Sequence, residues 1–80
     1  MPRYFFSFID GVDVRDGVGT LLEDDHAARQ YAERMRDSLE GTTGEGDWKV
    51  QVTDENGSRV LDVYPHRIEA QRREAKQLDY

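Results

Sequence analysis

The sequence contains no cysteine, two prolines and no long apolar run. Without cysteine the chain forms no disulfide and offers no thiolate, and we expect a reducing compartment. No stretch approaches the ~18 apolar residues that a membrane-spanning helix needs. The first residues also lack the apolar core of a secretory signal peptide. Together these absences predict a cytoplasmic protein with no membrane segment.

Basic side chains are also scarce, because 11 Lys and Arg against 17 Asp and Glu give a formal net charge of −6. Residues 1–64 hold 7 basic and 14 acidic side chains, whereas residues 65–80 hold 4 and 3. Proteins that bind nucleic-acid backbones neutralise phosphates with Lys and Arg, so this balance argues against a nucleic-acid partner. An acidic domain that associates electrostatically prefers basic partners, although its charge also serves solubility.

The 80 residues, of which 36% are hydrophobic, suffice for one small domain. A domain of this size buries only ~60% of the surface of its unfolded chain, so its core is thin and a dimer would stabilise it. We assign residues 1–65 to a single domain and residues 66–80 to a C-terminal extension. The extension has a helix-forming composition but little apolar surface, and we expect a marginal helix or a flexible tail.

The longest expected element is a helix from Asp24 to Gly41. Its apolar residues recur at spacings of three and four and form one stripe, with charged residues opposite. The stripe comprises Ala28, Tyr31, Ala32, Met35 and Leu39. We expect its three large members to supply most of the buried area and Arg36 to lie on the polar side. Asp24 or Asp25 can cap the start, and Gly41 is expected to end the helix.

Two pairs of strands are expected to flank the helix. Arg3 to Ile9 is rich in aromatic residues, and its alternation places Tyr4, Phe6 and Phe8 on one face, which we assign to the core. Asp10-Gly11 predicts a hairpin turn into a short strand that begins at Val12. The glycines that follow indicate a bend or bulge before the helix.

The second pair runs from Trp48 to Thr53 and then up to Pro65, with Asn56-Gly57 as a two-residue turn. This turn predicts a register that puts the apolar residues of both strands on the core face. The predicted pairs are Val52 with Leu61, Val50 with Val63, Thr53 with Val60, Gln51 with Asp62, Lys49 with Tyr64 and Asp54 with Arg59.

These elements predict an α+β fold in the order β-β-α-β-β. Its four-stranded, largely antiparallel sheet carries one helix on one face, followed by the C-terminal extension. The order of the strands in the sheet stays open.

Six short patterns stand out along the chain: Met1-Pro2-Arg3-Tyr4-Phe5-Phe6, Asp10-Gly11, Gly19 followed by Leu22 and Asp24, Ala27-Ala28 with Ala32, Trp48, and Val52-Thr53-Asp54-Glu55-Asn56-Gly57. With them the chain resembles a small bacterial family of uncharacterised domains, which open with a P-R-Y-F-F strand and end in a V-x-D-x-x-G hairpin. The resemblance extends from residue 2 to residue 63. It implies a small α+β domain without a known activity, and it identifies no catalytic residue.

Three acidic residues, Asp10, Asp13 and Asp16, recur at every third position before Gly17. An EF-hand calcium loop needs ligands at alternate positions and a final Glu. This stretch lacks that pattern, so we expect turn and strand-edge roles rather than a metal site.

Glu23, Asp24, Asp25 and His26 can form a carboxylate–imidazole site at the helix start. Helix capping accounts for the acids, and a thin domain leaves little room for a pocket. Two isolated histidines, His26 and His66, do not predict a zinc site. The chain also lacks a phosphate-binding loop and a nucleophile elbow. We therefore expect no catalytic residue, no metal, no cofactor and no enzymatic activity.

The outer face of the sheet, away from the helix, is the candidate interaction surface, because exposed apolar patches often mark sites of association. It comprises Phe5, Ile9, Val12, Val14, Val60 and Tyr64. Either a partner or a second copy covers this patch, or the C-terminal extension folds back over it through Ile68 and Leu78.

We therefore expect a small non-enzymatic protein-interaction or regulatory module with a protein partner or a homodimer. One alternative is a small-ligand-binding or enzymatic domain that uses the acidic cluster at the helix start. A further alternative is an antitoxin-like or nucleic-acid-associated regulator. The last needs a basic face, and Arg29, Arg34 and Arg36 of the helix are offset by neighbouring acids.

Overall fold

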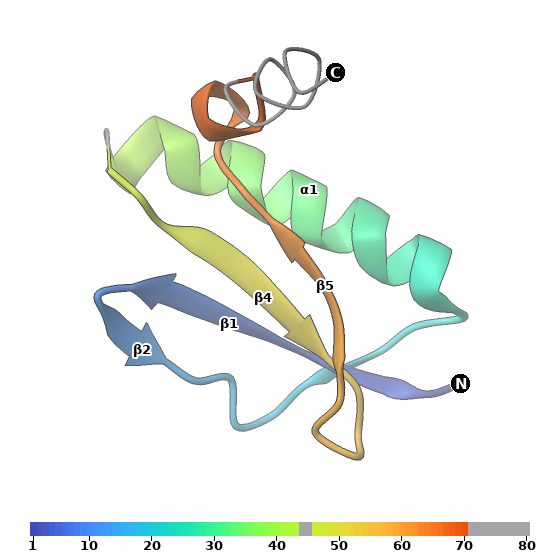
Figure 1. The fold of residues 1–80 in the computed structure, drawn as a ribbon. Coiled ribbons are helices and arrows are strands. Elements are labelled where there is room, and N and C mark those ends of the chain that lie inside the picture. The colour runs from blue at the N-terminus through green and yellow to red at the C-terminus, as the bar shows by residue number, and fades with distance from the viewer. Residues whose placement is uncertain (44–45, 71–80) are drawn as a thin grey trace, which may run out of the picture.

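The strands of the computed structural model form an antiparallel sheet (Figure 1). Its longest strand, β1 (Arg3–Asp10), pairs with β4 (Lys49–Thr53) along one edge, and β4 pairs with β5 (Arg59–Val63). The short strands β2 (Val12–Val14) and β3 (Thr20–Leu21) both pair with the other edge of β1. The order β2-β1-β4-β5, with β3 beside β1, confirms the α+β class and the β-β-α-β-β layout.

The structure describes residues 1–43 and 46–70. Within them, α1 (Asp25–Thr43) crosses one face of the sheet (Figure 1), and residues 66–70 are helical. The expected helix in the extension is thus present at 66–70, and residues 71–80 lie outside the described part. No helix in the described ranges has the length and apolar character needed to cross a membrane.

The prediction that Gly41 ends the helix is wrong, because α1 continues through Gly41 to Thr43. Gly41 does not adopt the positive φ of a terminating glycine. A glycine inside a helix costs about 1 kcal/mol relative to alanine, which weakens a helix without breaking it.

The core lies between α1 and the sheet. Val50 and Val52 of β4 are fully buried and pair with Phe8 and Phe6 of β1, and Trp48 is buried beside them. The predicted alternation of β1 is thereby confirmed for the buried Phe6 and for Tyr4, while Phe8 stays partly exposed.

The register of β4 and β5 follows the predicted apolar alternation at three positions. The confirmed pairs are Val50 with Val63, Gln51 with Asp62 and Val52 with Leu61. Nearer the turn the prediction is wrong, because Thr53 pairs with Arg59 instead of Val60. One extra residue therefore bulges from β5 at this point.

The turn itself explains the bulge. The Gly57 N–H donates to the Asp54 carbonyl at 3.0 Å, so the loop is longer than the predicted Asn56-Gly57 turn. Gly57 has a φ of 81°, whereas Asn56 keeps a negative φ. The Asp54 Oδ1 accepts the N–H groups of Asn56 and Ser58, both at 2.9 Å. This aspartate side chain stabilises the longer turn in place of a two-residue one.

The orientation of α1 differs from the expected one. Ala28 and Ala32 are fully buried, and Arg36, expected on the polar side, is only 8% exposed. Tyr31 and Met35 pack against the core but remain partly exposed. The two alanines let the helix backbone approach β4 and β5 closely, which turns the larger side chains sideways toward β1.

Arg36 is buried with its charge compensated. Its Nε donates to Asp37 Oδ1 at 3.1 Å and lies 3.7 Å from Glu40 Oε1. Its Nη1 donates to the Tyr64 carbonyl at 3.1 Å. A buried cation needs such partners, and these bonds connect α1 to the segment that follows β5.

Asp16 closes the gap between β2 and β3 on the edge of β1. Its Oδ2 accepts the Phe6 N–H, and its Oδ1 accepts the N–H groups of Val18 and Gly19, all at 3.0 Å. The Asp16 N–H donates to the Ser7 Oγ at 3.3 Å. The carboxylate therefore replaces a strand at the point where β1 would otherwise present an unpaired N–H group.

The surroundings of Asp16 also change its acidity. Burial alone would raise the pKa of the Asp16 carboxyl, but the N–H groups of Phe6, Gly19 and Val18 together hold this pKa below the ordinary value of 3.8. Gly19 adopts a φ of 80°, and a Cβ there would lie 2.8 Å from Arg3 Cγ. Glycine is thus required for the loop to return to β1.

The start of α1 is connected to β1 by a tyrosine. Asp24 Oδ1 accepts the Ala27 N–H at 2.9 Å, so Asp24 is the capping residue. Asp25 Oδ1 accepts the Tyr4 hydroxyl at 2.7 Å. This hydrogen bond, with burial and the nearby carboxylates, raises the pKa of Tyr4 to about 12.

Asp16→Asn should lower the free energy of unfolding at pH 7 by about 1–3 kcal/mol, because the amide nitrogen cannot accept the Phe6 N–H. Since the pKa of Asp16 is lowered by folding, its contribution is present above pH 3.8 and is lost as pH falls through the lowered value. Urea unfolding of wild type and Asp16→Asn should therefore show a smaller difference in the free energy of unfolding in acid than at pH 7. The matched control is Asp13→Asn on the exposed neighbouring carboxylate, which should change stability by less than about 0.5 kcal/mol. Equal losses in both variants would contradict this role.

Tyr4→Phe should remove the highest tyrosine transition from an absorbance titration at 295 nm, whereas Tyr31→Phe should keep it. Because the Tyr4 pKa is raised from 10.0 to about 12, its hydrogen bond stabilises the fold fully below pH 10 and loses this effect as pH rises toward 12. The stability difference between wild type and Tyr4→Phe should therefore vanish over that range. A titration unchanged by Tyr4→Phe would disprove the assignment.

Candidate functional site

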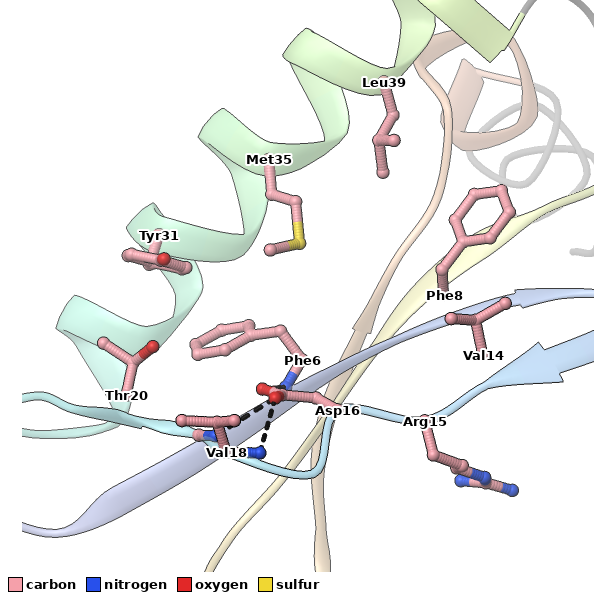
Figure 2. Close-up of a pocket in the computed structure, with 11 residues that line it drawn as sticks. Phe6, Phe8, Val14, Arg15, Asp16, Val18, Thr20, Tyr31, Met35 and Leu39 are labelled. Atoms are coloured by element: carbon pink, nitrogen blue, oxygen red, sulfur yellow. Dashed lines mark hydrogen bonds between the residues drawn. The ribbon is translucent and has the colours of Figure 1, made fainter.

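An open apolar groove of about 510 Å³ lies between α1 and the β1–β2 half of the sheet. Figure 2 shows apolar side chains from the strands and from the helix on opposite sides of this space. The strands contribute Phe6, Phe8 and Val14, and the helix contributes Tyr31, Met35 and Leu39. Its volume is within the range of binding clefts.

The groove is bridged at one end by two aromatic rings. The ring centroids of Phe6 and Tyr31 lie 4.6 Å apart. Leu39 and Phe8 line the other end (Figure 2), where the Phe8 ring rests on buried Trp48 with centroids 5.6 Å apart. The floor is therefore supported by the core, and the groove opens toward the C-terminal end of α1.

Two valines on the strand side of the groove are largely exposed to solvent. Val14 is 61% exposed, and Val18 in the loop after β2 is 77% exposed. Single exposed apolar residues are common on protein surfaces, but a contiguous patch beside a groove is typical of an interaction site.

The groove exists because one helix cannot cover the whole sheet. α1 packs on β4 and β5, and neighbouring strands lie ~4.8 Å apart, so a helix ~10 Å wide covers about two of them. Tyr4 and Phe6 of β1 are still buried, but beyond them Phe8 stays partly exposed and Val12 and Val14 of β2 are largely exposed.

The sequence placed Val12 and Val14 on the outer face, and this prediction is wrong. Asp10 pairs with Val12 and Phe8 with Val14, with Gly11 alone between the strands at a φ of 72°. A two-residue Asp10-Gly11 turn would have paired Ile9 with Val12. The one-residue difference reverses the faces, so both valines lie on the side of α1.

The other members of the predicted outer patch lie apart from these valines. Phe5 is partly buried, and its ring approaches Gly19 so closely that a Cβ there would lie 2.9 Å away. Val60 packs against the core at the bulge. Ile9 and Tyr64 line a smaller cavity of about 250 Å³.

Ile68 lines that smaller cavity together with Ile9 and Tyr64. Ile68 therefore lies near two residues of the predicted outer patch, while Leu78 lies outside the described residues. Lys49 on the same face donates to Asp62 at 3.1 Å and lies 5.9 Å from the centroid of the Tyr64 ring. This face is therefore partly covered and carries paired charges.

The acidic cluster at the helix start is divided between structural roles and solvent. Asp24 caps α1 and Asp25 accepts the Tyr4 hydroxyl. Glu23 and His26 are exposed. The capping prediction is thus confirmed for Asp24, whereas the tyrosine partner of Asp25 was not predicted.

The aspartates at positions 10, 13 and 16 also have separate surroundings. Asp16 accepts backbone N–H groups, and Asp13 pairs with Arg15 at 2.7 Å on the surface. Arg15 also donates to Gln51 at 3.1 Å. Turn and strand-edge roles describe these contacts.

His66 lies beside two carboxylates of α1, which its isolation in the sequence did not predict. Its Nδ1 is 2.6 Å from Glu40 Oε1, and its Nε2 is 3.7 Å from Asp37 Oδ1. Three such groups can hold a metal ion, but Arg36 Nε already lies 3.1 Å and 3.7 Å from the same two oxygens. A metal ion would therefore compete with a guanidinium. His66 connects the extension to α1 through its ring and backbone nitrogens, which both contact Glu40 Oε1.

Sequence reasoning missed the groove because its helical wall was assigned to the core. The signal that could have revealed it is Arg36, which follows Ala28 and Ala32 at four-residue intervals. The predicted apolar stripe combined two adjacent lines of helix residues. One line consists of the small Ala28 and Ala32, and the other of the large Tyr31, Met35 and Leu39.

A family model described as a domain of unknown function, DUF6894, matches residues 3–64. The match includes β1 to β5 and therefore every groove residue. No curated protein and no solved structure matches the chain.

The same substitution, Val→Thr, should change the free energy of unfolding differently at groove positions and at core positions. Val14→Thr and Val18→Thr should each change the free energy of unfolding by less than about 0.5 kcal/mol, since both side chains are mostly solvated. Val52→Thr should cost about 1–3 kcal/mol, because it buries a hydroxyl without an assured partner at a fully buried position. Urea unfolding measures all three. A large loss at Val14 or Val18 would show that these residues belong to the core.

Proposed function

We propose a function from the surface of this chain, which belongs to the DUF6894 family. This family is described as a domain of unknown function, so membership alone does not indicate a role. The proposed function is that of a small, non-enzymatic interaction module. It binds a segment of another protein in the groove between α1 and the β1–β2 half of the sheet. The carrying observation is the contiguous apolar lining contributed by both walls.

The energetics favour an occupant of this kind. Complete burial of a valine, leucine or methionine side chain is worth about 1.5–3 kcal/mol relative to its exposed state. Val14 and Val18 are mostly exposed in the free chain, so a partner gains much of this energy by covering them. The buried aromatic support beneath Phe8 keeps the floor in place, which lowers the ordering cost of binding.

The polar groups of the groove support binding rather than catalysis. Both oxygens of the Asp16 carboxylate accept backbone N–H groups, and Arg15 is occupied by Asp13 and Gln51. A general acid or base has to reach a substrate proton, and these side chains are committed to the fold. We place the module in the cytoplasm, in line with the absence of cysteine.

A second copy of the chain is the other protein that could fill the groove. β2 lies at an edge of the sheet, and Val12 is 75% exposed. Two chains with a net charge of −6 each repel one another, so we favour a different protein.

A photo-crosslinking amino acid placed at Val14 in living cells should form an adduct with a single protein partner, because Val14 lies on the groove wall. The same amino acid at Glu55, in the distant β4–β5 turn, is the matched control and should not form it. Met35→Glu in the Val14 protein should abolish the adduct while the circular dichroism spectrum stays unchanged. Mass spectrometry identifies the partner. The proposal fails if both positions give the same products, or if the Val14 adduct survives Met35→Glu.

A further inference from the structure

We propose that Asn56 is a site of spontaneous deamidation and that Asp54 restrains this reaction in the folded chain. Asn56 is the only asparagine in the sequence, and Gly57 follows it. The pair was expected to form a two-residue turn, but it lies inside a longer turn that the Asp54 side chain stabilises. The pair belongs neither to the groove nor to the core, so the inference is independent of the proposed function.

The reaction needs only these two residues and water. The Gly57 backbone nitrogen attacks the Asn56 side-chain carbonyl carbon and forms a C–N bond. The proton of the Gly57 N–H leaves with the side-chain amide nitrogen as ammonia, and the product is a cyclic succinimide. Water then opens this ring at one of its two carbonyl carbons, which yields an aspartyl or an isoaspartyl residue. No electrons are transferred, so the reaction requires no oxidant, reductant or cofactor.

The local structure exposes the pair to water and leaves the attacking nitrogen without steric cover. Asn56, Gly57 and Ser58 are all exposed. Apart from its chain neighbours, a Cβ added to Gly57 would meet no heavy atom within 4 Å. Gly57 also adopts a φ of 81°, which glycine tolerates better than other residues. The residue type that the turn requires at position 57 is therefore also the one that hinders attack on Asn56 least.

The hydrogen bonds of the turn oppose the reaction. The Gly57 N–H donates to the Asp54 carbonyl at 3.0 Å, so this nitrogen has to leave its acceptor before it loses the proton. The Asp54 Oδ1 accepts the N–H groups of Asn56 and Ser58, each at 2.9 Å, and fixes the backbone on both sides of Gly57. Deamidation of the folded chain therefore depends on local opening of this turn.

The products of the reaction change this end of the sheet. Deamidation adds a carboxylate beside Asp54 and Glu55, in a chain whose formal net charge is already −6. The isoaspartyl product also routes the backbone through the former side chain and so lengthens the backbone between residues 56 and 57. This displaces the Gly57 and Ser58 N–H groups relative to Asp54, and it should weaken the connection between β4 and β5.

Three forms of the full chain test this inference at mildly alkaline pH: wild type, Asp54→Ala and Glu55→Ala. Peptide mapping by mass spectrometry follows the mass increase that accompanies conversion of the Asn56 amide to a carboxyl group. Asp54→Ala removes two hydrogen bonds to a carboxylate, so it should raise the rate in the folded protein by about tenfold or more.

Glu55→Ala is the matched control, because it removes the same charge from the neighbouring residue. Glu55 is exposed, and its carboxylate makes no hydrogen bond or ion pair with the described residues. Its loss should change the rate by less than about twofold, since exposed charges act weakly through solvent. Asp54→Ser keeps a weaker hydroxyl acceptor at the same position and should give an intermediate rate.

The unfolded chain provides the second comparison, which does not depend on whether Asp54→Ala folds. In urea that unfolds the protein, wild type should deamidate faster than in the folded state and at the same rate as the variants. Asn56→Gln should abolish the mass increase in this peptide. If Glu55→Ala accelerates the reaction as much as Asp54→Ala, or if folded and unfolded wild type react equally fast, Asp54 does not restrain it. Absence of the mass increase in unfolded wild type would overturn the site itself.

Discussion

The close approach of Ala28 and Ala32 to β4 and β5 determines most of what is distinctive in this domain. Because both side chains are small, the backbone of α1 lies near the sheet, and the next residue on the same line, Arg36, is carried inside. Its guanidinium then needs Asp37 and the Tyr64 carbonyl as partners. The larger apolar residues are turned to the side, where, in the described part of the chain, no second helix covers Phe8 and β2. The groove is thus a direct consequence of how α1 packs.

Asp16 determines which part of the remaining surface can bind. A free strand edge invites another strand, but the Asp16 carboxylate occupies the Phe6 N–H between β2 and β3. The edge of β1 is therefore closed along its length by two short strands and one side chain. On this side of the sheet, strand addition is left to the outer sides of the short strands β2 and β3, while β5 forms the opposite edge.

The sequence predicted the elements and the core well, because alternation and helical periodicity directly report which residues face the interior. It could not predict the orientation of α1. The five apolar residues lie on two adjacent lines of the helix surface, and a rotation of the helix about its axis can turn either line toward the sheet. The sequence also misplaced Val12 and Val14, because a hairpin with Gly11 alone between paired residues reverses the faces that Asp10-Gly11 implies. The contact between His66 and Glu40 depends on the direction that the chain takes after Pro65, and no local sequence pattern predicts this direction. The candidate site was missed for these reasons, although its residues on β1, β2 and α1 were assigned to correct elements; β3, which contributes Thr20, was not predicted.

By the alternation of β1, the exposed Asp10 lies on the face of Phe8, beyond the residues that line the groove. Val50, Val52 and Trp48 are fully buried between α1 and the sheet. Phe6 belongs both to this core and to the groove, whereas Val14 and Val18 are largely exposed, so only the exposed part of the groove can change its residues at little cost to the fold.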